Sequence, residues 1–286
     1  MCAEDWIQAL TGYNVNAEWG QDMLKRLIIL SALILSSGAI AAGAVMIGSS
    51  STHNGPESES EKPILLMTPS ELFPNTQLRA LAITAQHGNV KKIDALIAQG
   101  VDVNGKGKFG ITPLFSAWQA RSKVGFKALL EHGADPNNIW TTGHTLLNEI
   151  AGTSDPYFLK LALKYGANPN LVAPRSDETP LFPAAQFLDG NGNVPILIKA
   201  GANLDYQRKP LMNTAMMDAA GVGHFKVVYE LLEAGADYKL KDAKGDDFRY
   251  WIRLSRADYQ PHWRKRIIEF LKQHNFWNDK DAKKPT

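Results

Sequence analysis

Apolar positions divide the chain into one unbroken apolar run and a longer region of periodic pattern. Residues 27–48 contain no charged side chain, and no polar face recurs among them as it would in a buried amphipathic helix. As a helix, these 22 residues would be about 33 Å long, which is enough to span a bilayer. Lys25 and Arg26 precede the run, and small residues in the order Ala-Ile-Ala lie within it. We therefore expect residues 23–48 to be a cleaved signal peptide or a membrane anchor.

The charges that flank the apolar run predict its orientation. Basic residues precede it and the polar, acidic string "SSSTHNGPESESEK" follows it, so the rest of the chain is expected on the far side of the membrane. An acidic leader, residues 1–22, comes before the run and is unlike the start of a signal peptide. Either Met23 is a second translation start, which would give an exported short form and a longer cytoplasmic form, or the start codon is assigned too far upstream.

Beyond a flexible linker expected at residues 49–71, the chain repeats itself. The strings "QGVDVN", "HGADPN", "YGANPN", "AGANLD" and "AGADYK" place glycines at Gly100, Gly133, Gly166, Gly201 and Gly235. These glycines are 33, 33, 35 and 34 residues apart. A second marker keeps the same phase, because "GITPLFSA", "GHTLLNEIA", "DETPLFPAA" and "MNTAMMDAA" place threonines at Thr112, Thr145, Thr179 and Thr214. A period of this length indicates a stack of similar structural units.

The two markers together resemble the ankyrin repeat, which opens with a Thr-Pro-Leu-His motif and closes with Gly-Ala-Asp. The resemblance implies an all-α fold, an ankyrin-repeat solenoid of helix-turn-helix repeats with β-hairpin tips. About five repeats are expected in residues 72–240. Residues 241–286 keep an amphipathic helix, "WRKRIIEFLKQH", but lose the motif. We expect this last region to be a divergent C-terminal cap with a basic tail.

Elementary chemistry accounts for the repeated residues. A threonine at a helix start accepts a hydrogen bond from a first-turn amide, and a proline after it gives up a donor that has no partner there. A glycine at the helix end adopts the left-handed conformation that a side chain would penalise. Each unit exposes an apolar face that only its neighbour can cover. Trp118 stands where repeats normally place a small residue, and we expect it to pack locally.

Composition and motifs argue against an enzyme. With 44% hydrophobic and 21% charged residues, the chain has the composition of an ordinary globular protein. Its one cysteine, Cys2, precedes the apolar run, so disulfides within the exported part and paired-cysteine metal sites are excluded. The string "GKGKFG" imitates a dinucleotide-binding loop, but it follows a helix end rather than a strand. The seven histidines lack metal-ligand spacing, so no catalytic residue, cofactor or metal is predicted.

The resemblance implies that the hairpin tips and the exposed side of the first helices bind a protein partner. The residues matched to the tips are Lys106, Lys108, Ile139, Trp140, Arg175, Arg208, Lys209, Lys241 and Lys244. Trp140 is expected to face solvent as a binding residue, unless it folds back onto its own stack and serves packing instead. The row of cations would suit an acidic surface on the partner.

A stack of ankyrin repeats delivered across a membrane resembles bacterial ankyrin-repeat immunity proteins, which bind and block type VI secretion phospholipase effectors. The resemblance implies a non-catalytic, periplasmic inhibitor of a cognate lipase toxin, present as a monomer or as a heterodimer with that toxin. Membrane contact is expected only through residues 27–48, and binding to nucleic acid is not expected. The alternative is a periplasmic ankyrin scaffold that supports an enzyme of envelope or oxidative stress.

Overall fold

The computed structural model describes residues 62–187, 192–254 and 260–277. The chain separates into two units, Met1–Ser60 and Glu61–Thr286, and all described residues belong to the second. The leader, the predicted signal peptide or anchor at residues 23–48, and most of the predicted linker lie outside the described residues. Among the helices that are described, none combines the length and the apolar character needed to cross a membrane.

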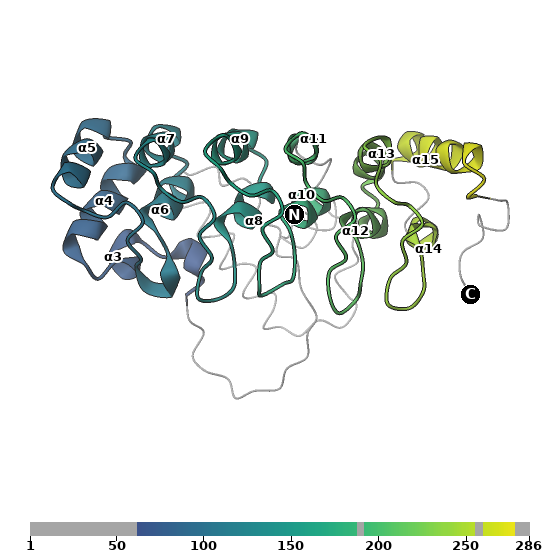
Figure 1. The fold of residues 1–286 in the computed structure, drawn as a ribbon, viewed down its shortest axis with the longest axis horizontal. Coiled ribbons are helices and arrows are strands. Elements are labelled where there is room, and N and C mark those ends of the chain that lie inside the picture. Colours follow the sequence, from purple (N-terminus) through teal and green to yellow (C-terminus); the bar gives the residue numbers. More distant parts are fainter. Residues whose placement is uncertain (1–61, 188–191, 255–259, 278–286) are drawn as a thin grey trace, which may run out of the picture. The chain divides into compact units, whose positions relative to one another are not determined.

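The described residues form a stack of helix pairs (Figure 1). The pairs are α4 (Thr76–Gln86) with α5 (Val90–Ala98), α6 (Pro113–Gln119) with α7 (Lys123–Glu131), α8 (Leu146–Ala151) with α9 (Pro156–Lys164), α10 (Leu181–Gln186) with α11 (Asn193–Lys199), α12 (Ala215–Val222) with α13 (Phe225–Glu233), and α14 (Phe248–Leu254) with α15 (Pro261–Gln273). The first helix of each pair belongs to an inner layer and the second to an outer layer, and neighbours pack within each layer. The predicted all-α solenoid of repeats is confirmed.

Short hairpins join successive pairs and all project to the same side of the inner helices (Figure 1). Each of four hairpins is held by one antiparallel bridge: Ile139 with Thr145, Ala173 with Glu178, Arg208 with Asn213, and Lys241 with Asp247. The hairpin tips expected from the resemblance are therefore present in the described chain, as single bridges rather than extended strands.

The first loop, which contains "GKGKFG", is a turn around the 3₁₀ helix η2 (Lys108–Gly110). The Gly107 amide donates a hydrogen bond to the Ile111 carbonyl at 2.8 Å. A Cβ atom on Gly107 would collide with the Leu72 carbonyl and the Phe73 ring. Close packing therefore accounts for this glycine, and no phosphate-binding role is needed to explain it.

The repeat threonines begin their helices in two different ways. The Thr145 hydroxyl accepts a hydrogen bond from the Asn148 amide, and Thr214 does the same for the Met217 amide. Thr112 makes no such bond, and the Thr179 hydroxyl has no hydrogen-bond partner among the described residues. The capping prediction is thus confirmed at two positions and wrong at the two where proline follows the threonine. Proline has no N–H to be capped, which removes one orphan donor of the first turn.

An asparagine in the loop after each of the first three outer helices joins neighbouring repeats. Asn137 Oδ1 accepts from the Asn168 amide at 2.7 Å, and its Nδ2 donates to the Gly166 carbonyl at 3.0 Å. Asn104 and Asn170 make the same two bonds to their next repeats. The glycine it reaches, Gly166, has a φ of 90°, the left-handed conformation predicted for the helix ends. The asparagine ladder therefore satisfies backbone groups that the helix ends leave open.

The ladder changes chemistry at its fourth position, where Asp205 replaces asparagine. Asp205 Oδ1 accepts from the Asp237 amide at 2.8 Å. An ionised carboxylate has no hydrogen to donate to the Gly235 carbonyl, so only one of the two ladder bonds can form here. The contact between the fourth and fifth repeats therefore has one ladder hydrogen bond, whereas each of the three preceding contacts has two.

A continuous hydrophobic core lies between the two helix layers. Its largest fully buried side chains include Phe115, Phe126, Phe158, Phe182, Phe225 and Phe248. Trp118 is also buried, with its ring 5.7 Å from that of Phe115. The prediction that Trp118 packs locally is confirmed.

The last ten residues of the predicted linker are folded and belong to the stack. They include the 3₁₀ helix η1 (Ile64–Leu66) and most of α3 (Pro69–Leu72). Leu72 and Phe73 are fully buried, and Gln119 Nε2 donates to the Leu65 and Met67 carbonyls at 3.0 and 2.8 Å. The predicted boundary at residue 71 is therefore wrong, because apolar side chains after residue 62 cover the open end of the first repeat.

The C-terminal region keeps the geometry of a repeat although it has lost the motif. Helix α14 packs on α12, and α15 packs on α13. Trp277 is buried at the end of the described chain, and Arg249 stacks on Phe276 at 4.0 Å. This region closes the apolar side of the fifth repeat as the predicted cap should.

Candidate partner-binding surface

Hydrogen bonds between successive loops join the tips into one hairpin edge. The links are the Thr141 amide to the Phe109 carbonyl (2.8 Å), the Arg175 amide to the Gly143 carbonyl (3.0 Å), and the Ala243 amide to the Leu211 carbonyl (2.8 Å). Between the third and fourth tips a side chain makes the link instead. Asp177 accepts from the Tyr206 hydroxyl at 2.9 Å and from the Lys209 amide at 2.7 Å. These amide and hydroxyl bonds lower the pKa of Asp177, with the Lys209 amide the largest cause.

Seven of the nine predicted tip residues are exposed along this edge. They are Lys106, Lys108, Ile139, Arg175, Lys209, Lys241 and Lys244. None of the six cations among them forms an ion pair with a described acidic side chain. Ile139 is 40% exposed and adds an apolar contact. The edge therefore presents mainly positive charge that the described chain does not neutralise.

Trp140 is buried, and the prediction that it faces solvent is wrong. Its side chain is only 4% exposed, and its ring lies 5.2 Å from Phe115 in an edge-on arrangement. The Trp140 amide donates to the His144 carbonyl at 2.9 Å, which closes the hairpin. Neighbouring residues of an extended segment point to opposite sides, so an outward Ile139 turns Trp140 toward the stack. The alternative, that it packs on its own stack, is the one the structure supports.

Arg208 is not a free tip cation, which corrects a second site residue. Its side chain is 20% exposed and pairs through Nη1 with Glu178 and through Nη2 with Asp218, the latter at 3.1 Å. Its Nε donates to Asn213 Oδ1 at 3.3 Å, and the guanidinium lies 5.2 Å from the Phe182 ring centroid. Five donors in a rigid fork suit such a multiple contact. Arg208 therefore joins the fourth hairpin to the inner helices.

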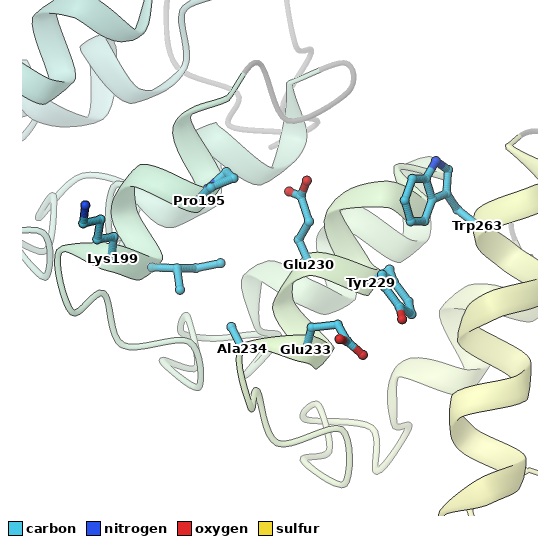
Figure 2. A pocket seen from close by; sticks show the side chains of 8 residues that line it. Pro195, Lys199, Tyr229, Glu230, Glu233, Ala234 and Trp263 are labelled. Atoms are coloured by element: carbon cyan, nitrogen blue, oxygen red, sulfur yellow. The ribbon is translucent and has the colours of Figure 1, made fainter.

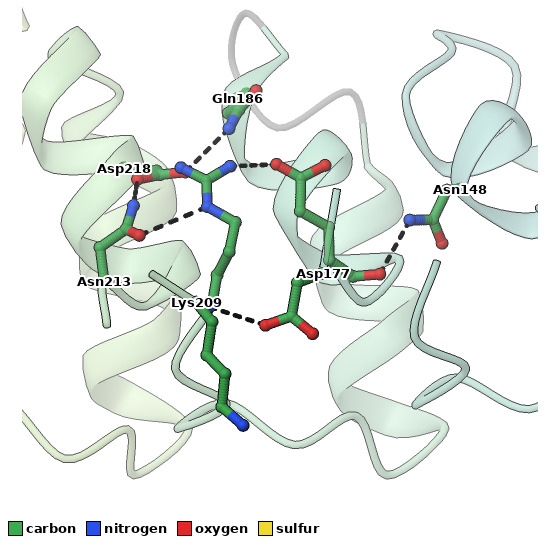
Figure 3. Close-up of polar contacts among 8 residues, drawn as sticks. Asn148, Asp177, Gln186, Lys209, Asn213 and Asp218 are labelled. Atoms are coloured by element: carbon green, nitrogen blue, oxygen red, sulfur yellow. Dashed lines mark hydrogen bonds and ion pairs between the residues drawn. The ribbon is translucent and has the colours of Figure 1, made fainter. Parts of the chain in front are cut away.

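Amide side chains complete this network (Figure 3). Gln186 Nε2 donates to Asp218 Oδ2 at 2.8 Å, and Asn213 donates to the other Asp218 oxygen. Asn148 Nδ2 donates to the Glu178 carbonyl at 3.0 Å. Burial raises the pKa of Asp218, and the Arg208 charge opposes this effect. The network gives the binding surface a rigid base between α8 and α12.

An inner row of side chains lies beside the hairpins, four residues after each repeat threonine. Its members are Ser116, Glu149, Pro183 and Asp218, one each on α6, α8, α10 and α12. The regular spacing is the sequence signal that identifies this row, whose members are not among the predicted site residues. Ser116 is fully buried, whereas the other three are partly exposed. The row is thus covered at its start and open from α8 onward.

Glu149 is the unusual member of the inner row. Every other residue of α8 is buried, and Glu149 makes no hydrogen bond or ion pair with a described side chain. Burial raises the pKa of Glu149 from 4.5 to about 7, because a low-polarity environment disfavours the charged carboxylate. The site therefore holds a desolvated carboxyl group that lacks a partner among the described side chains.

A hollow lies on the outer layer (Figure 2). It is lined by Pro195, Ile198, Lys199, Tyr229, Glu230, Glu233, Ala234 and Trp263. Pro195 lies six residues before the repeat glycine Gly201. At the equivalent position, the two preceding repeats have Lys127 and Lys160. No predicted site residue lines this hollow.

The described residues offer little for metal or nucleophilic chemistry. Within residues 62–187, 192–254 and 260–277, no three His, Cys, Asp or Glu side chains converge as ligands of a metal ion would. Glu178 and Asp218 are paired with Arg208, whereas Glu149 has no partner among the described side chains. The arrangement suits recognition of another molecule by charge and shape.

Comparisons with known proteins identify the repeats. Residues 144–242 match the family model described as ankyrin repeats (3 copies). Human Ankyrin repeat and SOCS box protein 16 is 32% identical over 180 residues, which are 60% of this chain and 40% of that protein. The crystal structure of EF0377, an ankyrin repeat protein, matches with a TM-score of 0.55 and 25% identity over 71% of this chain and 100% of that chain. The chain contains ankyrin repeats, generally a non-catalytic fold for protein–protein interaction, and spans 40% of the human relative.

Proposed function

From these ankyrin repeats we propose that the chain is a non-catalytic binding module whose protein partner docks on the hairpin edge and the inner row. The observation that carries the proposal is the line of six exposed cations on the tips, none of them paired with a described acid. Holding like charges in a row is unfavourable unless something compensates them. An acidic partner surface would do so, and the attraction would speed association more than it would strengthen the final complex.

The finer proposal is that the partner is a phospholipase or lipase toxin of a type VI secretion system and that the chain neutralises it in the periplasm. Support comes from the resemblance to ankyrin-repeat immunity proteins and from the export-like residues 23–48. An inhibitor that acts by covering its target needs a rigid surface rather than a reactive group. The Arg208 network and the asparagine ladder provide that rigidity.

The test is a protection assay in cells that produce the chain together with the candidate toxin encoded beside it. A tip variant combines Lys106→Glu, Lys209→Glu and Lys241→Glu. A matched control combines Lys91→Glu, Lys92→Glu and Lys160→Glu, three exposed lysines of the outer helices. Both variants change the net charge equally, so a difference between them reports on position.

We expect the control to protect and to co-purify with the toxin, and the tip variant to do neither. Protection by the tip variant would refute the hairpin edge as the binding surface. Failure of the unaltered chain to protect against that toxin, combined with binding to an envelope or oxidative-stress enzyme through the tips, would replace the immunity role by the scaffold role.

A further inference from the structure

The chain's own N-terminal segment, residues 62–73, shows how a side chain beside the inner row can bind backbone carbonyl groups. Two backbone carbonyls of this segment accept hydrogen bonds from one side-chain amide, Gln119 Nε2. Gln119 lies three residues after Ser116, on the same face of α6. Ser116 itself is fully buried. The end of η1 and the residue that follows it are therefore held on this face by a glutamine that binds backbone carbonyl groups rather than side chains.

The same arrangement continues beyond α6, where no described segment covers it. Gln186 follows Pro183 of the inner row by three residues, as Gln119 follows Ser116. One N–H of Gln186 donates to Asp218, and an amide side chain has a second N–H to donate. The open inner row thus contains a hydrogen-bond donor for backbone carbonyl groups, the Gln186 amide. It lies between two carboxyl groups, those of Glu149 and Asp218.

The carboxyl groups of the inner row favour a basic segment of a partner over an acidic one. Glu149 has no partner among the described residues, and leaving a desolvated carboxylate unpaired is unfavourable. A guanidinium or ammonium group placed against it would form a charge-assisted hydrogen bond. The residues that precede Lys62 in the chain read "ESESE", and such an acidic string would be repelled by Glu149 and Asp218. A basic segment from another molecule fits this surface better than the chain's own upstream residues.

We propose that the inner row from α8 to α12 binds an extended segment of the partner that places a lysine or arginine side chain against Glu149. The proposal rests on the proposed function and names the recognition element within it. Neighbouring helices are about 8–10 Å apart, and an extended chain advances about 3.3 Å per residue. A segment of roughly six residues therefore crosses from α8 to α12.

A displayed library of linear twelve-residue peptides, selected on the full chain, provides the probe. Selected peptides are then synthesised and titrated into three proteins: the unaltered chain, Glu149→Gln and Glu233→Gln. Glu233 is an exposed glutamate of α13 on the outer layer, so its replacement is a matched change of charge at a remote site. Thermal unfolding of each protein checks that it is folded.

We expect the selected peptides to share a lysine or arginine and to bind Glu149→Gln at least tenfold more weakly than the unaltered chain and Glu233→Gln. Replacing that basic residue by alanine should weaken binding to the unaltered chain equally and should add no further loss in Glu149→Gln. Peptides without a basic residue, or with equal affinity for Glu149→Gln, would overturn the proposal, as would a selection that yields no binder. Glu149→Gln leaves the hairpin tips unchanged. Failure of the Glu149 proposal would therefore not refute the proposed function, which the protection assay tests separately.

Discussion

Replacing Glu149 by glutamine removes a carboxyl group whose charge is disfavoured in the folded chain. Burial raises its pKa from 4.5 to about 7. An acid whose pKa is higher in the folded state adds stability below its unfolded pKa, and that stability is lost as the pH rises through the folded value. The unaltered chain should therefore lose stability between about pH 4.5 and pH 7 through this group. Glutamine, which has a similar shape and no charge, should not.

The size of the effect follows from the change in pKa. At about 1.36 kcal/mol per pKa unit, a rise from 4.5 to about 7 corresponds to roughly 3 kcal/mol for the ionised group. Glu149 retains contact with water, so we expect about 1–2 kcal/mol after allowance for solvent screening. Glu149→Gln should thus have a free energy of unfolding above that of the unaltered chain at alkaline pH, with a smaller difference at acidic pH.

The assay is urea unfolding followed by circular dichroism at about pH 5 and about pH 8. Comparing the two proteins at each pH removes the contributions of all other titrating groups. Glu233→Gln is the control, because that glutamate is exposed, and its difference from the unaltered chain should not change with pH. An equal difference for Glu149→Gln at both pH values would refute the reasoning that Glu149 is a desolvated, unpartnered carboxyl group.

Three further substitutions test the packing. Trp140→Ala should lower the free energy of unfolding by about 3–5 kcal/mol, as for a buried aromatic side chain. A nearly unchanged melting temperature would show instead that the Trp140 side chain is exposed to solvent. Asp205→Asn should restore the donor to the Gly235 carbonyl and raise the free energy of unfolding by about 0.5–1.5 kcal/mol, whereas a loss would contradict the ladder. Gly107→Ala should place a methyl group against the Leu72 carbonyl and lower the melting temperature, with overpacking typically costing about 1–3 kcal/mol; tolerance of alanine would disprove the close contact.

The fold could be predicted because its signals are local and repeated. A glycine every 33 to 35 residues reports a backbone conformation that other residues rarely adopt, as the φ of 83° at Gly133 shows. The segment at residues 62–71 escaped prediction for the opposite reason. It folds because Leu72, Phe73 and Gln119 hold it against the first two repeats, and contacts over such a distance in the chain leave no periodic pattern.

The binding surface was predictable in outline but not in detail. The hairpin positions follow from the period, so the exposed lysines could be located. Trp140 and Arg208 could not, because one residue of register decides whether a hairpin side chain points outward. Whether Arg208 is free also depends on Glu178 and Asp218, which lie 30 residues before it and 10 after it in the chain. The charge of a residue is visible in sequence, whereas the partner that neutralises it is a property of the fold.

The most direct test of the binding surface is hydrogen–deuterium exchange of the chain with and without its co-purified protein partner. We expect slower exchange on binding in α8 and in the hairpins at residues 139–145, 173–178, 208–213 and 241–247. Exchange in the outer helices α7, α9 and α13 should stay the same. Slower exchange confined to the outer helices, with the hairpins unaffected, would contradict the claim that this chain binds its partner through the hairpin edge and the inner row.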